Sequence, residues 1–196
     1  MPLGAFKAAL MGTAGVSTGD VVLLSTQTAS DSASITFTGL MTSTYGEYIF
    51  KFYNINPESE PDRLFQFQVN ATDGADFNDS AITSSYFRAY HTEADATGLS
   101  YVTSQDQAQG TAFQPMAQGP SSAADGGCAG ELHIFNPSST TYVKHFYSRI
   151  GEMYYAEWAT DQFSSGYIND TTAIDDIQFK MSANNFDGKI KMWGVK

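Results

Sequence analysis

The stretch that decides the fold is Gly130–Ile150, with the sequence GELHIFNPSSTTYVKHFYSRI. Leu132 and Ile134 stand two residues apart with a histidine between them, a spacing typical of a strand with one buried face. The segment Asn136–Ser139 interrupts this pattern, because Pro137 has no amide hydrogen and its ring fixes φ. β-Branched and aromatic residues then resume. Two strands joined by a short Asn/Pro/Ser loop predict a β-hairpin.

The same period of two recurs along the chain, and no helix–strand alternation is visible. About ten segments show it, with turn signals roughly every ten residues, as in a sandwich or jelly roll. We therefore predict an all-β fold, a jelly-roll-like antiparallel β-sandwich with an N-terminal arm. Besides the hairpin, the expected strands are Val21–Leu24, Ile35–Thr38, Glu47–Ile55, Leu64–Val69, Ser85–His91, Leu99–Val102, Met153–Trp158, Phe163–Ile168, Ile177–Met181 and Ile190–Val195.

Local patterns also predict the exposure of two glutamines and the structure of two connecting segments. Gln66 and Gln68 alternate with apolar residues, so we expect them to face solvent. Ser104–Gly110 has an N-cap serine and an early aspartate, which are compatible with one or two helical turns. Thr111–Gly127 is polar and punctuated by proline and glycine, which predicts a long loop with a functional or interface role.

The last two alternating segments lie close together in the sequence, separated by a turn at residues 182–188. We expect them to form a closing hairpin that buries one apolar face, so that loss of the last residues unfolds the domain. The side chains on that face are Ile177, Phe179, Met181, Ile190 and Met192.

We divide the chain into an arm, residues 1–19, and a single β-sandwich domain, residues 20–196. The arm is apolar but rich in glycine, alanine and threonine, so it cannot form a core of its own. Lys7 lies inside its apolar part, which argues against a signal peptide. A short helix at Phe6–Leu10 is one option. We expect the arm to anchor the chain to a particle or a neighbouring subunit, through Met1, Leu3, Phe6 and Leu10.

Composition excludes several partner classes. The net charge is −11 and the sequence pI is about 4.4, which argues against a nucleic-acid or anionic-membrane partner, because such binding needs clustered lysine and arginine. No apolar run approaches the ~18 residues of a membrane span. Cys128 is the one cysteine, so an intrachain disulfide is excluded. It is either a free thiol that suits assembly in a reducing cytoplasm or a small apolar filler.

No catalytic signature is present in the sequence. There is no Gly-x-Ser-x-Gly elbow, no phosphate loop and no dinucleotide fingerprint, and Glu131, Glu152 and Glu157 are scattered without identifiable partners. We expect no enzymatic activity and no cofactor, with a glycan-cleaving enzyme as the weakest option.

Metal binding has two weak signals. His133 and His145 lie in the two strands of the predicted hairpin and share a metal only if they fall opposite each other. Two acidic loops could collect Ca²⁺, but neither has EF-hand spacing, so we expect solvated loops and no metal site. Their carboxylates are Asp73, Asp76 and Asp79 in one loop, and Asp170, Asp175 and Asp176 in the other.

Aromatic residues give the best direct hint of recognition. Tyr154, Tyr155 and Trp158 cluster in sequence, and Trp193 alternates away from the apolar residues of its segment. Such rings stack on sugars or anchor protein interfaces. Alternatively, both faces of their strands are buried against sister subunits. We favour subunit packing over sugar binding.

Several stretches resemble small structural proteins of the virions of marine and cyanobacterial tailed phages. The resemblance spans nearly the whole chain and its elements are strands and turns. The matching residues are Met1–Phe6, Ile35–Leu40, Tyr45–Tyr48, Tyr53–Pro57, Ala89–His91, Leu132–Thr140 and Gly188–Val195.

This resemblance implies a non-enzymatic structural protein located in the virion after assembly in the host cytoplasm. We expect a capsid decoration or cement protein on the particle surface. The alternative is a tail fibre, a knob or a lectin-like receptor-binding module that recognises a host surface glycan. The expected partners are other virion proteins, either the major capsid protein or tail components. We also expect a homo-oligomer, with a trimer favoured.

Overall fold

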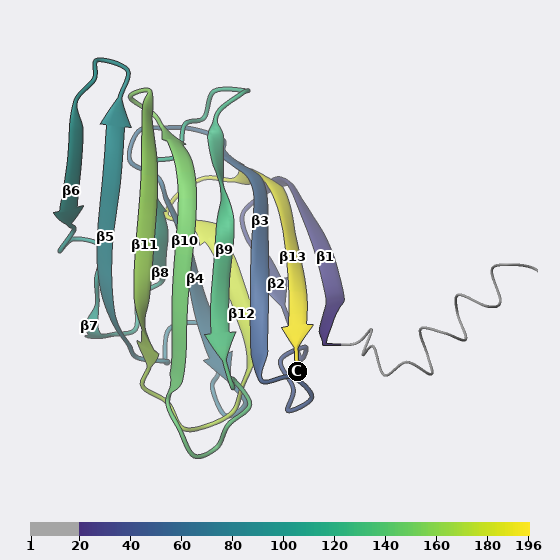
Figure 1. Ribbon diagram of the computed structural model, residues 1–196. Helices are drawn as coiled ribbons and strands as arrows, with labels where there is room; N and C mark the ends of the chain where they lie inside the picture. The colour runs from purple at the N-terminus through teal and green to yellow at the C-terminus, as the bar shows by residue number, and fades with distance from the viewer. Residues whose placement is uncertain (1–19) are drawn as a thin grey trace, which may run out of the picture.

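Two antiparallel β-sheets packed face to face make up the protein, in a computed structural model that describes residues 20–196 (Figure 1). Met1, Leu3, Phe6 and Leu10, and the helix considered at Phe6–Leu10, lie outside the described residues. The β-sandwich predicted from the alternation of side chains is therefore confirmed. Residues 20–196 contain no helix that could span a membrane.

The larger sheet has nine strands in the order β1-β13-β3-β9-β10-β11-β5-β6, with β7 paired to β5. Its strands are β1 (Val21–Ser32), β3 (Glu47–Pro57), β5 (Ile82–Thr92), β6 (Thr97–Tyr101), β7 (Ala108–Gly110), β9 (Gly127–Phe135), β10 (Lys144–Tyr154), β11 (Trp158–Ile168) and β13 (Phe186–Val195). The smaller sheet has the order β2-β12-β4-β8. Its strands are β2 (Ile35–Phe37), β4 (Leu64–Ala71), β8 (Gln114–Gln118) and β12 (Ile174–Met181).

The chain changes layer at most of its connections. The strands β2, β4, β8 and β12 belong to the smaller sheet, and each is followed by a strand of the larger one. Because the chain passes repeatedly from one sheet to the other, the apolar faces of both sheets are closed against each other, as in a jelly roll.

The predicted hairpin is confirmed as β9 and β10, in the middle of the larger sheet. Ile134 lies opposite Phe146, and Gly130 lies opposite Ile150. The connecting loop, residues 136–143, is longer than the Asn/Pro/Ser segment alone.

Aromatic rings from both sheets fill the core. Phe179 of β12 lies with its ring centroid 5.2 Å from that of Phe50 and 5.3 Å from that of Phe52, both on β3. Phe65 of β4 packs edge-on to Phe52 at 5.1 Å. These four rings are buried, and they join the two layers.

The closing hairpin expected at the C-terminus is wrong. β12 pairs with β2 and β4 in the smaller sheet, whereas β13 pairs with β1 and β3 in the larger sheet. The short connection between Met181 and Phe186 therefore crosses from one layer to the other. The expected apolar residues are all buried, but they face one another across the core: Ile177, Phe179 and Met181 from one side, Ile190 and Met192 from the other.

Four other expectations are corrected. Met153–Trp158, expected as a strand, spans the end of β10, a turn and the first residue of β11. Gln66 and Gln68 are buried, because loops cover the outer side of β4, and the Gln68 amide donates to the carbonyl oxygens of Ser80, Thr111 and Ala112. The segment 104–110 forms a turn and the short strand β7 in place of a helix. The long loop expected at 111–127 contains β8, an edge strand that accommodates Pro115.

Candidate interaction surface

The outer face of the larger sheet, on the side away from the smaller sheet, carries most of the exposed apolar side chains. In Figure 1 the smaller sheet lies behind the larger one, and this outer face is turned toward the viewer. Nine large hydrophobic side chains are exposed in residues 20–196, and register places seven of them on this face. These seven are Val21, Leu23, Tyr53, Phe87, Leu99, Tyr101 and Met153, whereas Leu40 and Tyr142 lie in loops.

One row of apolar and aromatic residues crosses five neighbouring strands of this face. In order across the sheet, each is the direct cross-strand partner of the next: Leu23, Trp193, Ile49, His133 and Tyr147. Leu23 is 44% exposed at the β1 edge. The indole Nε1 of Trp193 is buried and has no hydrogen-bond acceptor in the described residues.

A second apolar group lies toward the opposite edge of the face. Phe163 of β11 stacks on Phe87 of β5 with ring centroids 5.2 Å apart. Phe87 is 40% exposed and is the cross-strand partner of Tyr101 on β6. Leu99, also on β6, is 74% exposed. Register places Phe163 and Phe87 in line with Arg149, so this group is separate from the row described above, and exposed apolar side chains stand toward both edges of the face.

Hydrogen bonds and ion pairs fix the side chains in the middle of the outer face. His133 Nδ1 lies 2.5 Å from Glu47 Oε1, and the imidazole stacks on Tyr147. Lys51 Nζ lies 3.4 Å from Glu131 Oε2. Burial alone would raise the pKa of Glu131, but hydrogen bonds and charge from His133 and Lys51 outweigh it and lower that pKa. The centre of the face is therefore fixed by its own contacts.

A charged row runs beside the apolar row. Lys191, Lys51, Glu131 and Arg149 are successive cross-strand partners. Arg149 forms a bidentate ion pair with Asp161, with Nη2 2.7 Å from Oδ2. By contrast, Lys191 has no ion pair within 4.0 Å among the described residues.

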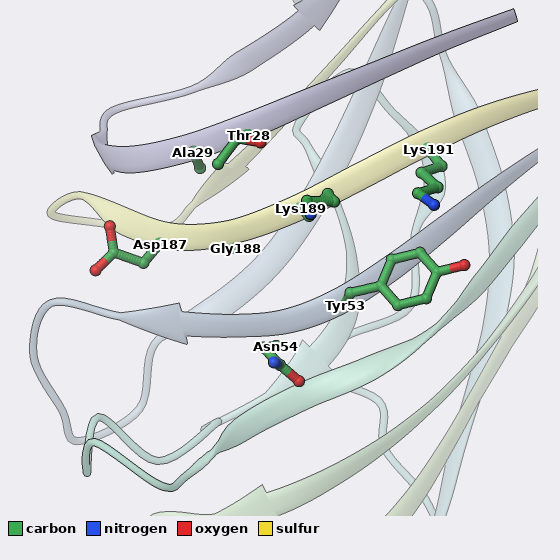
Figure 2. Close-up of a pocket in the computed structure, with 8 residues that line it drawn as sticks. All are labelled: Thr28, Ala29, Tyr53, Asn54, Asp187, Gly188, Lys189 and Lys191. Atoms are coloured by element: carbon green, nitrogen blue, oxygen red, sulfur yellow. The ribbon is translucent and has the colours of Figure 1, made fainter.

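A basic hollow of about 550 Å³ opens beside this charged row, between β1, β13 and β3 (Figure 2). The ring of Tyr53 forms part of its wall, and Lys191 Nζ lies 5.4 Å from the ring centroid. Lys189 also lines the hollow and, like Lys191, has no ion pair in the described residues. One carboxylate, that of Asp187, lines it as well and accepts a hydrogen bond from the backbone amide of Asp31. Backbone at positive φ, at Asn54 (49°) and Gly188 (141°), accompanies the irregular pairing of β13 with β3 here.

An acidic hollow of about 490 Å³ lies on the other half of the sheet, around the end of β5. Glu93, Asp95 and Glu157 line it, together with His91. His91 Nε2 lies 3.2 Å from Asp95 Oδ1, whereas Glu93 and Glu157 have no ion pair in the described residues.

A third hollow, of about 470 Å³, lies between the other two. Gly151 on β10 has no side chain to fill it, whereas the neighbouring Gly130 on β9 is the cross-strand partner of the buried Ile150. Charged groups of both signs, including Glu131 and Arg149, border it. The outer face thus has a basic half, an acidic half and a mixed centre.

The aromatic residues singled out in the sequence lie in two places. Trp158 packs between Tyr90 and Tyr154, with ring centroids 5.1 and 5.0 Å away, and Tyr155 lies 4.3 Å from Tyr154. Tyr154 is only 7% exposed. Because neighbouring rings cover Trp158, this cluster is not an open stacking platform. Trp193 lies on β13, several strands away, on the outer face.

The histidines considered as metal ligands are not opposite each other. His133 faces Tyr147, and His145 faces Tyr167. In residues 20–196 no group of three His, Cys, Asp or Glu side chains is arranged to hold a metal. Carboxylates of the two acidic loops cap backbone amides: Asp79 accepts from Ala75 and Asp170 accepts from Thr172.

Two buried ionisable groups and the cysteine lie in the interior. Lys144 donates to the carbonyl oxygens of Asp170 and Thr172, and burial lowers its pKa. Burial raises the pKa of Glu152 to about 8, and neither of its carboxylate oxygens has a hydrogen-bond partner in the described residues. Cys128 is buried and burial raises its pKa, so it packs as a small apolar side chain.

The residues that sequence reasoning missed are those of the outer face, Tyr147, Phe163 and Phe87 above all. They lie in predicted strands, but only the strand order brings them together.

A comparison with known protein families and with curated proteins finds no match for this chain.

Proposed function

We propose that the chain is a non-enzymatic structural protein of a virion, a decoration or cement protein on the surface of a tailed-phage capsid. The observation that carries the proposal is the concentration of exposed apolar side chains on one sheet face, seven of the nine in residues 20–196. Scattered exposed hydrophobics are ordinary, but their concentration on one face is typical of a protein interface.

The charge of the molecule agrees with a role in assembly. With a net charge of −11, free copies repel one another and stay soluble, while a face that carries both signs can still pair specifically. We assign the outer face to contacts between subunits.

The arm, residues 1–19, is the proposed anchor to the shell. Its sequence contains Met1, Leu3, Phe6 and Leu10 and no acidic residue. It enters the domain at Asp20, directly before β1 at one edge of the larger sheet. An apolar, non-acidic segment at an edge suits a groove on a neighbouring protein such as the major capsid protein.

A second candidate function is recognition of a host glycan by a tail fibre or knob. The observation that favours it is the basic hollow, where the exposed Tyr53 lies beside two unpaired lysines. A tyrosine face with adjacent cations suits an acidic sugar. Binding to acidic glycans on an array, lost in Tyr53→Ala, would support this candidate against the first.

The proposal is tested on purified particles. Quantitative mass spectrometry is expected to count hundreds of copies for a capsid decoration protein, whereas a few dozen or fewer would indicate the tail. The truncated chain 20–196 should fold but fail to attach to particles that lack the protein. Attachment of the truncated chain at the level of the full chain would overturn the assignment of the arm, and absence of the protein from particles would overturn the proposed function.

A further inference from the structure

We propose that in the free chain the arm, residues 1–19, docks on the outer face of its own larger sheet, over two rows of apolar and aromatic side chains at the end where β1 begins. This inference goes beyond the proposed function, because it concerns the chain before it attaches to a particle. It rests on the side chains of the two rows, on the place where the arm joins the sheet, and on the length and charge of the arm.

Two neighbouring rows make this end of the outer face apolar. The apolar row described above runs from Leu23 to Tyr147. A second row lies two residues further along each strand, on the side away from the charged row. In order across the sheet, its members are Val21, Val195, Glu47 and Phe135. The two rows contain one carboxylate, Glu47, which is bound to His133, and no lysine or arginine.

The two rows are partly open to solvent. Val21 is 54% exposed and Leu23 is 44% exposed, and the side chains of Trp193, Phe135 and Tyr147 are half-buried. The indole Nε1 of Trp193 is buried and has no hydrogen-bond acceptor in the described residues. Because buried polar groups are nearly always hydrogen-bonded, we expect a segment that packs on this row to supply an acceptor, for which a backbone carbonyl oxygen is suitable.

The arm joins the sheet beside these rows. It ends one residue before Asp20, and Val21 is both the first residue of β1 and the first member of the second row. In Figure 1, β1 begins at the lower end of the sheet, where β13 ends. Gly15 and Gly19 stand just before this point and permit the backbone to turn from the direction of β1 onto the face.

The arm is long enough to cover the rows. From β1 to β10 the apolar row crosses four strand spacings of about 4.8 Å, which is roughly 19 Å in all. The 19 residues of the arm span about 63 Å when fully extended and about 28 Å as a continuous helix. Either length is sufficient to cross the row.

The chemistry of the arm matches these rows better than that of a second copy does. Leu3, Phe6 and Leu10 supply apolar side chains, and Lys7 is the one charged side chain. The net charge of −11 therefore divides into +1 on the arm and −12 on residues 20–196. The arm is attracted to the rest of the chain, whereas a second folded domain brings like charge.

A docked arm links the two surfaces that the proposed function uses. While the arm covers the rows, free copies present less apolar surface to one another. Transfer of the arm to a groove on the shell then uncovers the rows for a neighbouring subunit. Contacts between subunits are thereby coupled to attachment.

The test is quenching of Trp193 fluorescence by acrylamide in the full chain. A Trp158→Phe background leaves Trp193 as the one tryptophan, and circular dichroism checks that each variant folds. Phe6→Ser/Leu10→Ser should raise the quenching constant by about twofold or more, because an arm without these apolar side chains no longer covers the ring. Thr13→Ala/Ser17→Ala, also in the arm, is the matched control and should leave the quenching constant unchanged.

A mixing experiment identifies whose arm covers the rows. The Phe6→Ser/Leu10→Ser reporter is mixed with an excess of a chain that has the intact arm and no tryptophan, Trp158→Phe/Trp193→Phe. Trp193 of the reporter should stay accessible, because each intact arm remains on its own sheet. Restored protection would assign the arm to the face of a neighbouring copy and would overturn the inference.

The inference is also overturned if Trp193 is as accessible with the intact arm as with Phe6→Ser/Leu10→Ser, because the arm then does not cover the face. Copy counting and the particle-attachment assay test the proposed function separately, because they measure the chain on the particle and not in its free form.

Discussion

His133 lies flat on Tyr147, with ring centroids 4.4 Å apart and ring planes 13° from parallel. The two residues are direct cross-strand partners in the central hairpin. Their contact, together with the bond from His133 to Glu47, holds rings in place at the middle of the outer face. A face whose side chains are already ordered loses less conformational entropy on binding, which favours its use in assembly.

The core depends on Phe179, a ring of the smaller sheet that contacts rings of both sheets. Phe179→Ala removes contacts with Phe50, Phe52 and Phe65 and leaves a cavity, so we expect a loss of about 3–5 kcal/mol of unfolding free energy. Urea denaturation followed by fluorescence measures it. Tyr142→Ala, at a side chain that is 73% exposed, is the control and should change stability by less than about 0.5 kcal/mol. Equal losses in both variants would contradict the assigned core.

Gly130 and Gly151 border the same hollow but differ in the space available for an added Cβ atom. A Cβ on Gly130 would overlap the carbonyl oxygen of Arg149, whereas a Cβ on Gly151 would lie 4.0 Å from the nearest carbonyl oxygen, that of Ala129. We expect Gly130→Ala to cost about 1–3 kcal/mol. Gly151→Ala should be neutral or stabilise by up to about 1 kcal/mol. Thermal unfolding of the pair checks this, and the reverse ranking would show that the register of β9 and β10 is wrong.

Glu152 makes stability depend on pH. Its pKa is raised to about 8 in the folded chain from 4.5, chiefly by burial, so the folded state holds a proton that the unfolded state releases. Unfolding free energy should therefore fall as pH rises from about 4.5 to 8, by ~1.4 kcal/mol per pH unit at most.

The Glu152→Gln variant lacks this titration. Compared with wild type, it should be about equally stable at pH 4.5 and more stable by about 2–3 kcal/mol at pH 7.5, within the bound set by one buried proton. Urea titrations of both chains across this range are the measurement. Parallel pH profiles for wild type and variant would show that Glu152 is not held protonated.

A substitution at Phe87 is expected to weaken assembly more than folding. Phe87 is 40% exposed on the outer face and stacks on Phe163, so Phe87→Ser should cost about 1 kcal/mol of stability while weakening contacts between subunits by about tenfold or more. Leu40→Ser, at a similarly exposed loop position, is the control and should leave self-association unchanged. Sedimentation velocity over a concentration series measures the difference in self-association. Self-association that tolerates Phe87→Ser would place the contact between subunits on another surface.

The sequence predicted strands well because side-chain alternation is local. Tyr48, Phe50 and Phe52 are buried, as their spacing indicates. The pairing of strands, by contrast, depends on residues far apart in the sequence. The sequence of the short turn after Met181 is compatible with a hairpin within one sheet and with a crossing to the other layer, and here the chain crosses to β13.

The candidate surface was harder to predict for the same reason. Tyr147, Phe163 and Phe87 come from three strands, and their contact depends on strand order and register. Sequence clustering instead pointed to Tyr154 and Trp158, which pack against each other. Gln68 was misassigned because alternation says nothing about loops that cover the outer side of a strand.

The central claim is that this chain is a virion surface protein that assembles through the outer face of its larger sheet. A cryo-electron microscopy reconstruction of particles containing the chain tests it most directly. We predict many copies on the shell, with Phe87 and Tyr147 covered by a neighbouring subunit. Copies whose outer face is bare, or particles that lack the chain, would contradict the claim.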